Sequence, residues 1–276
     1  MMTKEQTKTL YYILRIACAM CFIGHGAFGI ITKQIWCNYF AVAGIDESLA
    51  YQLMPVVGIA DIVLGLVLLF YPVRIAAAWL VFWGLLTASM RPLSGEPFAE
   101  FLERAGNYGA PLVLLILTGL QGISPNTRWF QKLEAPATLS KEHEKLVVIT
   151  LQIIAFTLLF GHGWLNIIEK PALLKQYISF GVQSPETMAH FIGIVEIIGA
   201  CSIVLWPARQ IILILFIWKM LSETQYPAFP IFEWVERGGS YATLLALLFI
   251  VKNKDLAAQA LSLKWRMAPH LKHQHQ

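Results

Sequence analysis

The sequence predicts an all-α membrane protein made of two tandem, parallel four-helix bundles, and three observations support this prediction. The chain is 57% hydrophobic and only 14% charged, whereas a soluble domain usually carries about 25% charge. Eight apolar runs approach the length of about 20 residues that a helix needs to cross a bilayer. The second half of the chain also repeats the polar residues of the first half in the same order.

The apolar runs are predicted to be helices, because only helices satisfy their own backbone groups in lipid without closing a barrel. No barrel-like alternation of apolar and polar residues appears. The predicted spans are residues 10–30, 51–70, 73–90, 106–122, 146–167, 187–205, 208–221 and 239–252. They divide the chain into a first unit (1–122), a cytoplasmic linker (123–145), a second unit (146–252) and a cytoplasmic tail (253–276).

The even number of spans in each unit predicts that both units enter the membrane in the same orientation, related by an axis along its normal. In this topology 14 of the 21 Lys and Arg residues lie on the side of the N-terminus. The positive-inside rule then places both termini in the cytoplasm, with the chain integral to the inner membrane and in contact with its lipids. The same rule accounts for the net charge of +4 without a nucleic-acid partner.

The internal repeat identifies the polar residues of interest. Its offset starts at 137 and falls to 133 as small insertions and deletions accumulate. Gly24-His25-Gly26 returns as Gly161-His162-Gly163, Lys33 as Lys170, Asp61 as Glu196, Glu103-Arg104 as Glu236-Arg237, and Tyr108 as Tyr241. All of these residues are predicted to lie toward the outer half of the membrane.

Asp61 and Glu196 are predicted near the middle of the membrane, where an acid costs at least about 2.5 kcal/mol and needs a partner. The partners are either Arg104 and Arg237, or the two histidines. The pair then either binds a polar headgroup and moves protons, or pins two helices together as a structural ion pair.

The glycines beside His25 and His162 allow a neighbouring backbone or a flat ligand to approach closely. Each histidine either contacts a quinone or another substrate, or packs between helices; a haem shared by both histidines is a third reading. No metal site is predicted. Cys18 and Cys21 form a CxxC inside a membrane helix, where burial quiets thiols, so we expect plain packing and no disulfide.

The outer loops 91–104 and 222–237 combine prolines with aromatic and charged residues. This composition predicts short helices in the outer interface, which either roof each bundle or serve as interfacial anchors. Walker, Rossmann, HExxH and Gly-x-Ser-x-Gly motifs are missing, so a self-contained hydrolase or soluble-type dehydrogenase is not predicted.

One stretch carries a family resemblance. Gly193-Ile-Val-Glu196-Ile-Ile-Gly199, followed by Trp206-Pro207-Ala-Arg209, resembles the DoxX family of small four-helix membrane bundles. The first unit matches this pattern at Gly24, Gly26, Lys33, Gly58, Asp61, Gly65 and Arg74, with Asp61 where the family usually has Glu. The resemblance implies two fused DoxX-like units. It also implies a role like those of quinone-reducing subunits, maturation factors for periplasmic enzymes or cargo receptors.

The predicted function is a quinone-linked oxidoreductase subunit that binds a quinone or small polar headgroup near the outer leaflet. His25 or His162 would hydrogen-bond a carbonyl, and Asp61 or Glu196 would exchange the proton. The predicted binding residues are Lys33, Arg104, Tyr108, Lys170, Arg237 and Tyr241, and the structural ones are Gly24, Gly26, Gly161, Gly163, Glu103 and Glu236. Electrons would come from a periplasmic or membrane donor protein. The alternatives are a non-catalytic carrier or assembly factor for a lipid, metabolite or client protein, and a small-molecule transporter.

Overall fold

The computed structural model describes residues 2–119, 129–224 and 230–251, and over these ranges its regular structure is helical. The predicted tail (253–276) and part of the predicted linker lie outside the described residues. The helices are α1 (Lys4–Ile30), α2 (Trp36–Val42), α3 (Glu47–Phe70), α4 (Arg74–Leu93), α5 (Ala99–Glu103), α6 (Ala105–Leu117), α7 (Lys141–Ile167), α8 (Pro171–Ser179), α9 (Pro185–Leu205), α10 (Arg209–Glu223), α11 (Pro230–Glu236) and α12 (Gly238–Ile250).

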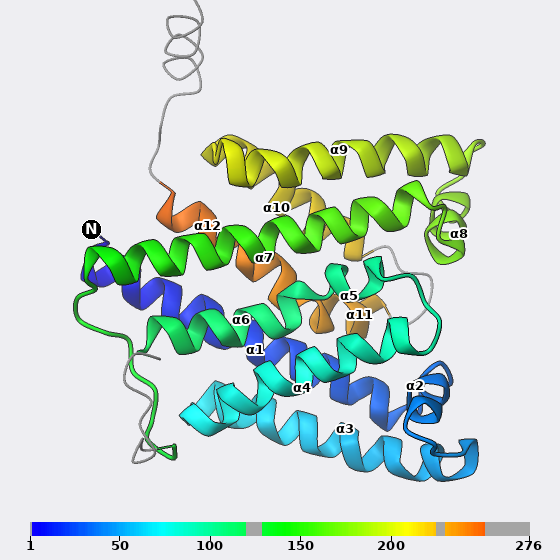
Figure 1. Cartoon of the computed structure of the whole chain (residues 1–276), viewed down its shortest axis with the longest axis horizontal. Helices are drawn as coiled ribbons and strands as arrows, with labels where there is room; N and C mark the ends of the chain where they lie inside the picture. The colour runs from blue at the N-terminus through cyan, green and yellow to red at the C-terminus, as the bar shows by residue number, and fades with distance from the viewer. Residues whose placement is uncertain (1, 120–128, 225–229, 252–276) are drawn as a thin grey trace, which may run out of the picture.

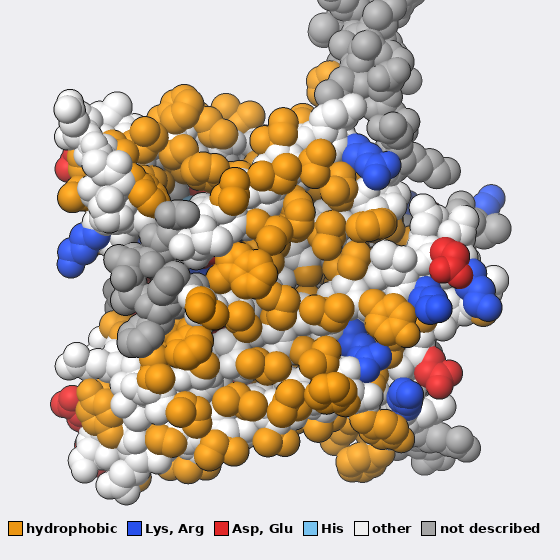
Figure 2. Space-filling model, turned by 180° about the vertical axis from the view of Figure 1, so that it is seen from behind, with side chains coloured by type: hydrophobic (Ala, Val, Ile, Leu, Met, Phe, Trp, Pro, Cys, Tyr) orange, Lys and Arg blue, Asp and Glu red, His pale blue; other side chains and the backbone are white. Residues whose placement is uncertain are grey.

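Five helices in the described ranges are long and apolar enough to cross a membrane, namely α1, α3, α4, α7 and α9. This suggests a membrane protein. The helices α6 and α12 are apolar but have only 13 residues each, and α10 has 15, so eight full spans are not confirmed. Apolar side chains cover the middle of the face seen in Figure 2, and most Lys and Arg side chains on that face gather at the end where α1 begins and α12 ends.

Side-chain caps explain where three of the long helices, α1, α3 and α7, begin. Thr3 and Gln6 form a capping box, so α1 begins at Lys4, six residues before the predicted span. Asp46 caps α3 through the backbone N–H of Leu49, and Ser140 caps α7 in the same manner. The first helix of each unit is therefore longer than its apolar run, because the cap lies in the polar sequence that precedes the run.

The two units share one core, with α1, α6, α7 and α12 packed together at its centre (Figure 1). The helices α3 and α4 flank this centre on the first unit's side, α3 against α1 and α4 against α6. On the other side, α9 packs against α7 and α10 against α12. Because α1 contacts α12 and α6 contacts α7, the packing does not separate into two independent bundles.

Glycine allows the closest helix contacts. A Cβ built on Gly26 would lie 2.5 Å from the carbonyl oxygen of Gly58, and one built on Gly163 would lie 2.8 Å from that of Gly193. The backbones of α1 and α3, and of α7 and α9, therefore touch beside each histidine. This contact sets the distance between each histidine and the acid on the facing helix.

The short helices α5 and α11 are exchanged between the units. Helix α5 belongs to the first unit but packs against α7, while α11 of the second unit packs against α1. A side chain at Gly24 would overlap the backbone of Glu236, and one at Gly161 would overlap the backbone of Glu103. The predicted roof helices are thus present, but each covers the histidine helix of the other unit.

Candidate functional site: two histidine–carboxylate pairs

Each histidine binds the acid of its own unit. His25 Nδ1 on α1 lies 2.7 Å from Asp61 Oδ2 on α3, and His162 Nδ1 on α7 lies 2.6 Å from Glu196 Oε2 on α9. Both acids are almost fully buried. Of the two sets of partners that the sequence left open, the structure brings the histidines to the acids. Each acid holds its imidazole in one orientation and leaves Nε2 as the ring nitrogen available to other groups.

A cavity of about 260 Å³ adjoins His25. It lies among α1, α2 and α4 and reaches the junction of α5 and α6, and its lining is mostly apolar. The lining includes His25, Trp83, Ala88, Arg104, Asn107 and Glu236. The imidazole of His25 packs against Trp36, with ring centroids 4.6 Å apart. A mostly apolar chamber with a few convergent polar groups is the usual form of a small-molecule site.

Two buried polar groups in this lining have no hydrogen-bond partner, the indole Nε1 of Trp83 and the amide Oδ1 of Asn107. The great majority of buried polar side-chain atoms in proteins are hydrogen-bonded, so each exception calls for an explanation. Both atoms are themselves buried, so a ligand in the cavity that supplied the complementary groups would reach them after small movements of the neighbouring side chains.

In the second unit the corresponding tryptophan has a partner, whereas Ser240 Oγ, at the position of Asn107, has none. Glu196 Oε1 accepts a hydrogen bond from Trp218 Nε1 at 2.8 Å. The other oxygen, Oε2, is hydrogen-bonded to His162 Nδ1 and accepts a hydrogen bond from the Asn166 amide at 3.4 Å. Tyr177 donates to Asn166 Oδ1 at 2.6 Å. A second cavity of about 260 Å³, lined by His162, Tyr177, Trp218 and others, adjoins this network. The acid of the second unit is therefore bonded through both oxygens.

Arg104 and Arg237 bind other acids than those predicted. Arg104 Nη1 lies 2.8 Å from both Glu100 and Glu103, and Arg237 binds Glu103 as well. Burial alone raises the pKa of Glu103, but Arg237 and Arg104 outweigh it and hold the pKa well below its ordinary value. Arg237 Nε also lies 3.9 Å from Glu223 Oε2. The two arginines therefore form an ion cluster at the interface of the units.

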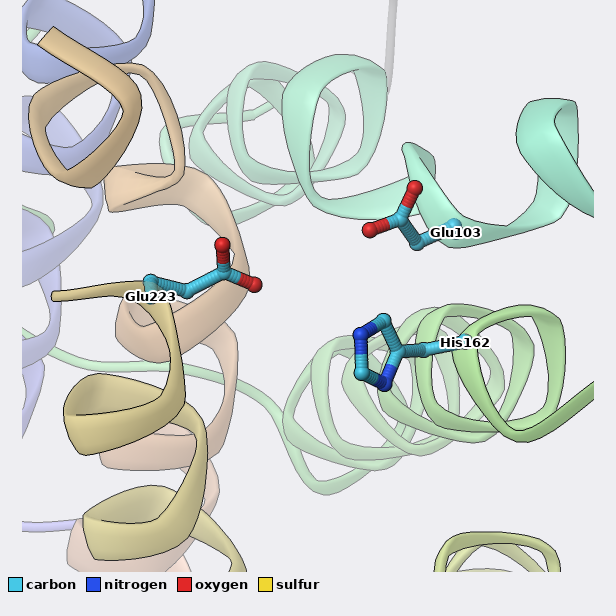
Figure 3. A group of neighbouring side chains, drawn as sticks. All are labelled: Glu103, His162 and Glu223. Atoms are coloured by element: carbon cyan, nitrogen blue, oxygen red, sulfur yellow. The ribbon is translucent and has the colours of Figure 1, made fainter. Parts of the chain in front are cut away.

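Three buried groups that could ligate a metal converge at this cluster, as Figure 3 shows: Glu103, His162 and Glu223. Their ligand atoms lie within 4.8 Å of one another, and carboxylates and imidazole are donors that a divalent metal accepts. Arg237 and Lys219 already pair with the two carboxylates. The sequence predicted no metal here, and Glu223 was not among the residues it identified.

Four other predicted binding residues lie elsewhere in the fold. Lys33 binds Glu233 at 2.6 Å and Lys170 binds Glu100, so both lysines tie the units together. Tyr108 stacks on Phe101 with centroids 5.5 Å apart, and Tyr241 stacks on Trp234 at 5.4 Å. Neither lysine and neither tyrosine is part of the lining of the two cavities described above.

No family model, characterised protein or solved structure matches this chain. The function is therefore inferred from the geometry of the two sites.

Several functional candidates escaped the sequence reasoning. Trp83 returns as Trp218 at an offset of 135, and Glu100 returns as Glu233 at 133, so the repeat itself contained a signal for them. Asn107 is aligned with Ser240 and gave no such signal.

Proposed function

We propose that this chain is an integral membrane subunit that binds a quinone near the outer leaflet and supports its redox chemistry. The observation that carries the proposal is the first cavity, a mostly apolar chamber lined by a carboxylate-bound histidine and by two residues, Trp83 and Asn107, that each have a buried polar atom without a partner. A quinone ring needs apolar walls, and its oxygens need a few well-placed polar partners.

The His25–Asp61 pair supplies the proton chemistry. Nδ1 is engaged by Asp61, so Nε2 faces the ligand. Reduction of a quinone takes up an electron pair and a pair of protons. The imidazolium of His25 passes one of these protons from Nε2 to a quinone oxygen, and Asp61 stabilises the charged ring before the transfer. The second proton comes from water and reaches the other quinone oxygen. The electron pair comes from a periplasmic or membrane donor protein, because no cofactor motif is visible in this chain.

We include in this proposal the DoxX-like family and the orientation in the membrane that the sequence predicts. Two DoxX-like units, an inner-membrane location and cytoplasmic termini are consistent with the five span-length helices and with the position of both ends of the described helical core on one side (Figure 1). An outer-leaflet quinone site agrees with the short helices α2, α5, α8 and α11 at the opposite end.

The aromatic side chains of the two outer loops (91–104 and 222–237) support the carrier hypothesis less than the cavity supports the quinone hypothesis. A docking surface requires them to face outward, yet Phe101 and Trp234 stack on tyrosines of α6 and α12. Phe232 meets Phe28 edge-on with centroids 6.2 Å apart. Among these aromatics Phe98 is more than half exposed. Most of the rings therefore hold the roof helices in place.

Purification in mild detergent tests the proposal. An organic extract should contain quinone in proportion to protein, and the double variant Asp61→Asn with Glu196→Gln should lose it while eluting as the same species. The optical spectrum of the same preparation tests for haem, and the co-eluting proteins identify the electron donor. Undiminished quinone in the double variant would show that the assigned acids are not part of the site.

A further inference from the structure

The two units differ at the positions that separate each cavity from the ion cluster. Gly84 and Ala88 on α4 are aligned with Lys219 and Glu223 on α10 at an offset of 135. Gly84 and Ala88 line the first cavity. Lys219 and Glu223 are both almost fully buried, and Lys219 Nζ lies 2.5 Å from Glu223 Oε1 in an ion pair whose angles are not those of a hydrogen bond.

This difference in side-chain size between α4 and α10 determines how far each cavity extends. With only glycine and alanine on α4, the first cavity reaches Arg104, Asn107 and Glu236. The second cavity ends at Glu223, and Arg237 is not part of its lining. The Glu223 carboxylate stands between that cavity and Arg237, 3.9 Å from the guanidinium Nε. The second unit thus carries its own oxygen atoms where the first unit has free space.

A second difference lies at the buried acids. Glu196 reaches Trp218 as well as its histidine. Asp61 is shorter by one methylene, about 1.5 Å of reach, and Trp83 Nε1 is left without a partner. The first unit therefore lacks two groups that the second unit has, namely an acceptor for the tryptophan and a carboxylate at the position of Glu223, where it has Ala88.

We propose that the first unit alone binds the quinone, in the space that Glu223 and Lys219 close in the second unit. This inference rests on the proposed function and refines it. The ligand is uncharged, because Arg104 and Arg91 in the lining already bind carboxylates. After small side-chain movements that expose these two buried atoms, a ring carbonyl accepts a hydrogen bond from Trp83 Nε1, and the hydroxyl of the reduced form donates one to Asn107 Oδ1.

Titration of the purified full chain with a short-chain ubiquinone and with its reduced form, each followed by equilibrium dialysis, tests this assignment. We expect saturation at one ligand per chain. Asn107→Leu should weaken binding of the reduced form about tenfold, the effect of one lost hydrogen bond, while the thermal midpoint of the empty protein stays unchanged or rises. The midpoint does not fall because the substitution removes a buried group that has no partner in the empty protein.

The repeat supplies a matched pair of variants. Trp83→Phe should weaken binding about tenfold and lower the midpoint only slightly, since its N–H makes no hydrogen bond in the empty protein. Trp218→Phe should leave binding intact and lower the midpoint more, because Glu196 loses a donor. Ala88→Leu fills the first cavity directly and should also weaken binding at least about tenfold.

The outcomes separate the two levels of the proposal. An absence of saturable binding to the wild-type chain would overturn the proposed function itself. Saturation at two quinones per chain would overturn only the restriction to the first unit. The same conclusion would follow if Trp218→Phe weakened binding while Trp83→Phe and Asn107→Leu, with normal midpoints, did not.

Discussion

Lys33 of the first unit lies 2.6 Å from Glu233 of the second, and their aligned counterparts Lys170 and Glu100 pair in the opposite direction. Together the pairs fix α5 and α11 over the other unit's histidine helix. The outer end of the protein is therefore organised by contacts between the units, and each histidine site depends on residues from both halves of the chain.

Removing Arg237 should strongly destabilise the protein. Arg237→Met leaves the buried Glu103 and Glu223 without this counter-charge, and breaking a buried pair in this way typically costs about 3–5 kcal/mol. Chemical unfolding in detergent measures the change. The exposed pair of His190 and Glu169 provides the control, since His190→Ala should cost less than about 1 kcal/mol. Equal losses in the two variants would contradict the buried cluster.

Acid should destabilise the interface between the units. Burial raises the pKa of Glu103, Glu100 and Glu236, but the neighbouring cationic groups prevail and leave each pKa below its ordinary value. A lowered pKa in the folded state means stability that is complete above the unfolded value of about 4.3 and is lost as pH falls toward the folded values. The thermal midpoint should therefore hold between pH 7 and about 5 and decline below about 4.3. A midpoint that rose on acidification would contradict this assignment.

Alanine at Gly24 or Gly161 should disrupt the exchanged helices. The added methyl group would overlap the backbone of Glu236 or Glu103, and backbone has little room to yield. Overpacking of this kind costs about 1–3 kcal/mol or more. Gly199→Ala serves as the control, because its nearest neighbour is the end of the Leu215 side chain at 2.8 Å, which can move. The unfolding free energies of the three variants test whether the two glycines that face backbone cost more stability than the control.

Asp61→Glu should convert the first site into a copy of the second. The longer side chain can reach Trp83 Nε1 as Glu196 reaches Trp218, so stability should be kept while quinone affinity falls about tenfold. The converse change, Glu196→Asp, should leave the Trp218 N–H without a hydrogen-bond acceptor. It should cost about 1–3 kcal/mol of stability without affecting the affinity for quinone. Equilibrium dialysis measures the affinity of both variants, and chemical unfolding measures their stability. Equal losses of affinity in the two variants would contradict the assignment of the quinone to the first unit.

Cys37 tests the proposed orientation in the membrane. It lies on α2 at the end of the fold opposite the termini and is partly exposed, whereas Cys18 and Cys21 are buried in α1. A membrane-impermeant maleimide should label intact cells through Cys37, and Cys37→Ser should remove this labelling. Labelling that required broken cells would place α2 on the cytoplasmic side.

The repeat made much of the site predictable, because it identified His25, Asp61 and their counterparts as polar groups kept in an apolar chain. The partner of each acid stayed open, since hydropathy locates a residue along a helix but does not say which helix it faces. The exchange of α5 and α11 was beyond prediction for the same reason. The open groups of Trp83 and Asn107 are visible only once the surrounding side chains are placed.

The exchanged roof helices also bear on the history of the chain. If half of this sequence folded alone, Gly24 or Gly161 would lack its cover, and a second copy would supply it across a twofold axis, as in an isologous dimer. Joining the halves in one polypeptide preserves that mutual cover and removes the requirement that both halves be identical. Substitutions can then fill the site of one half with side chains that only stabilise the fold, while the other half keeps the small residues that line its cavity.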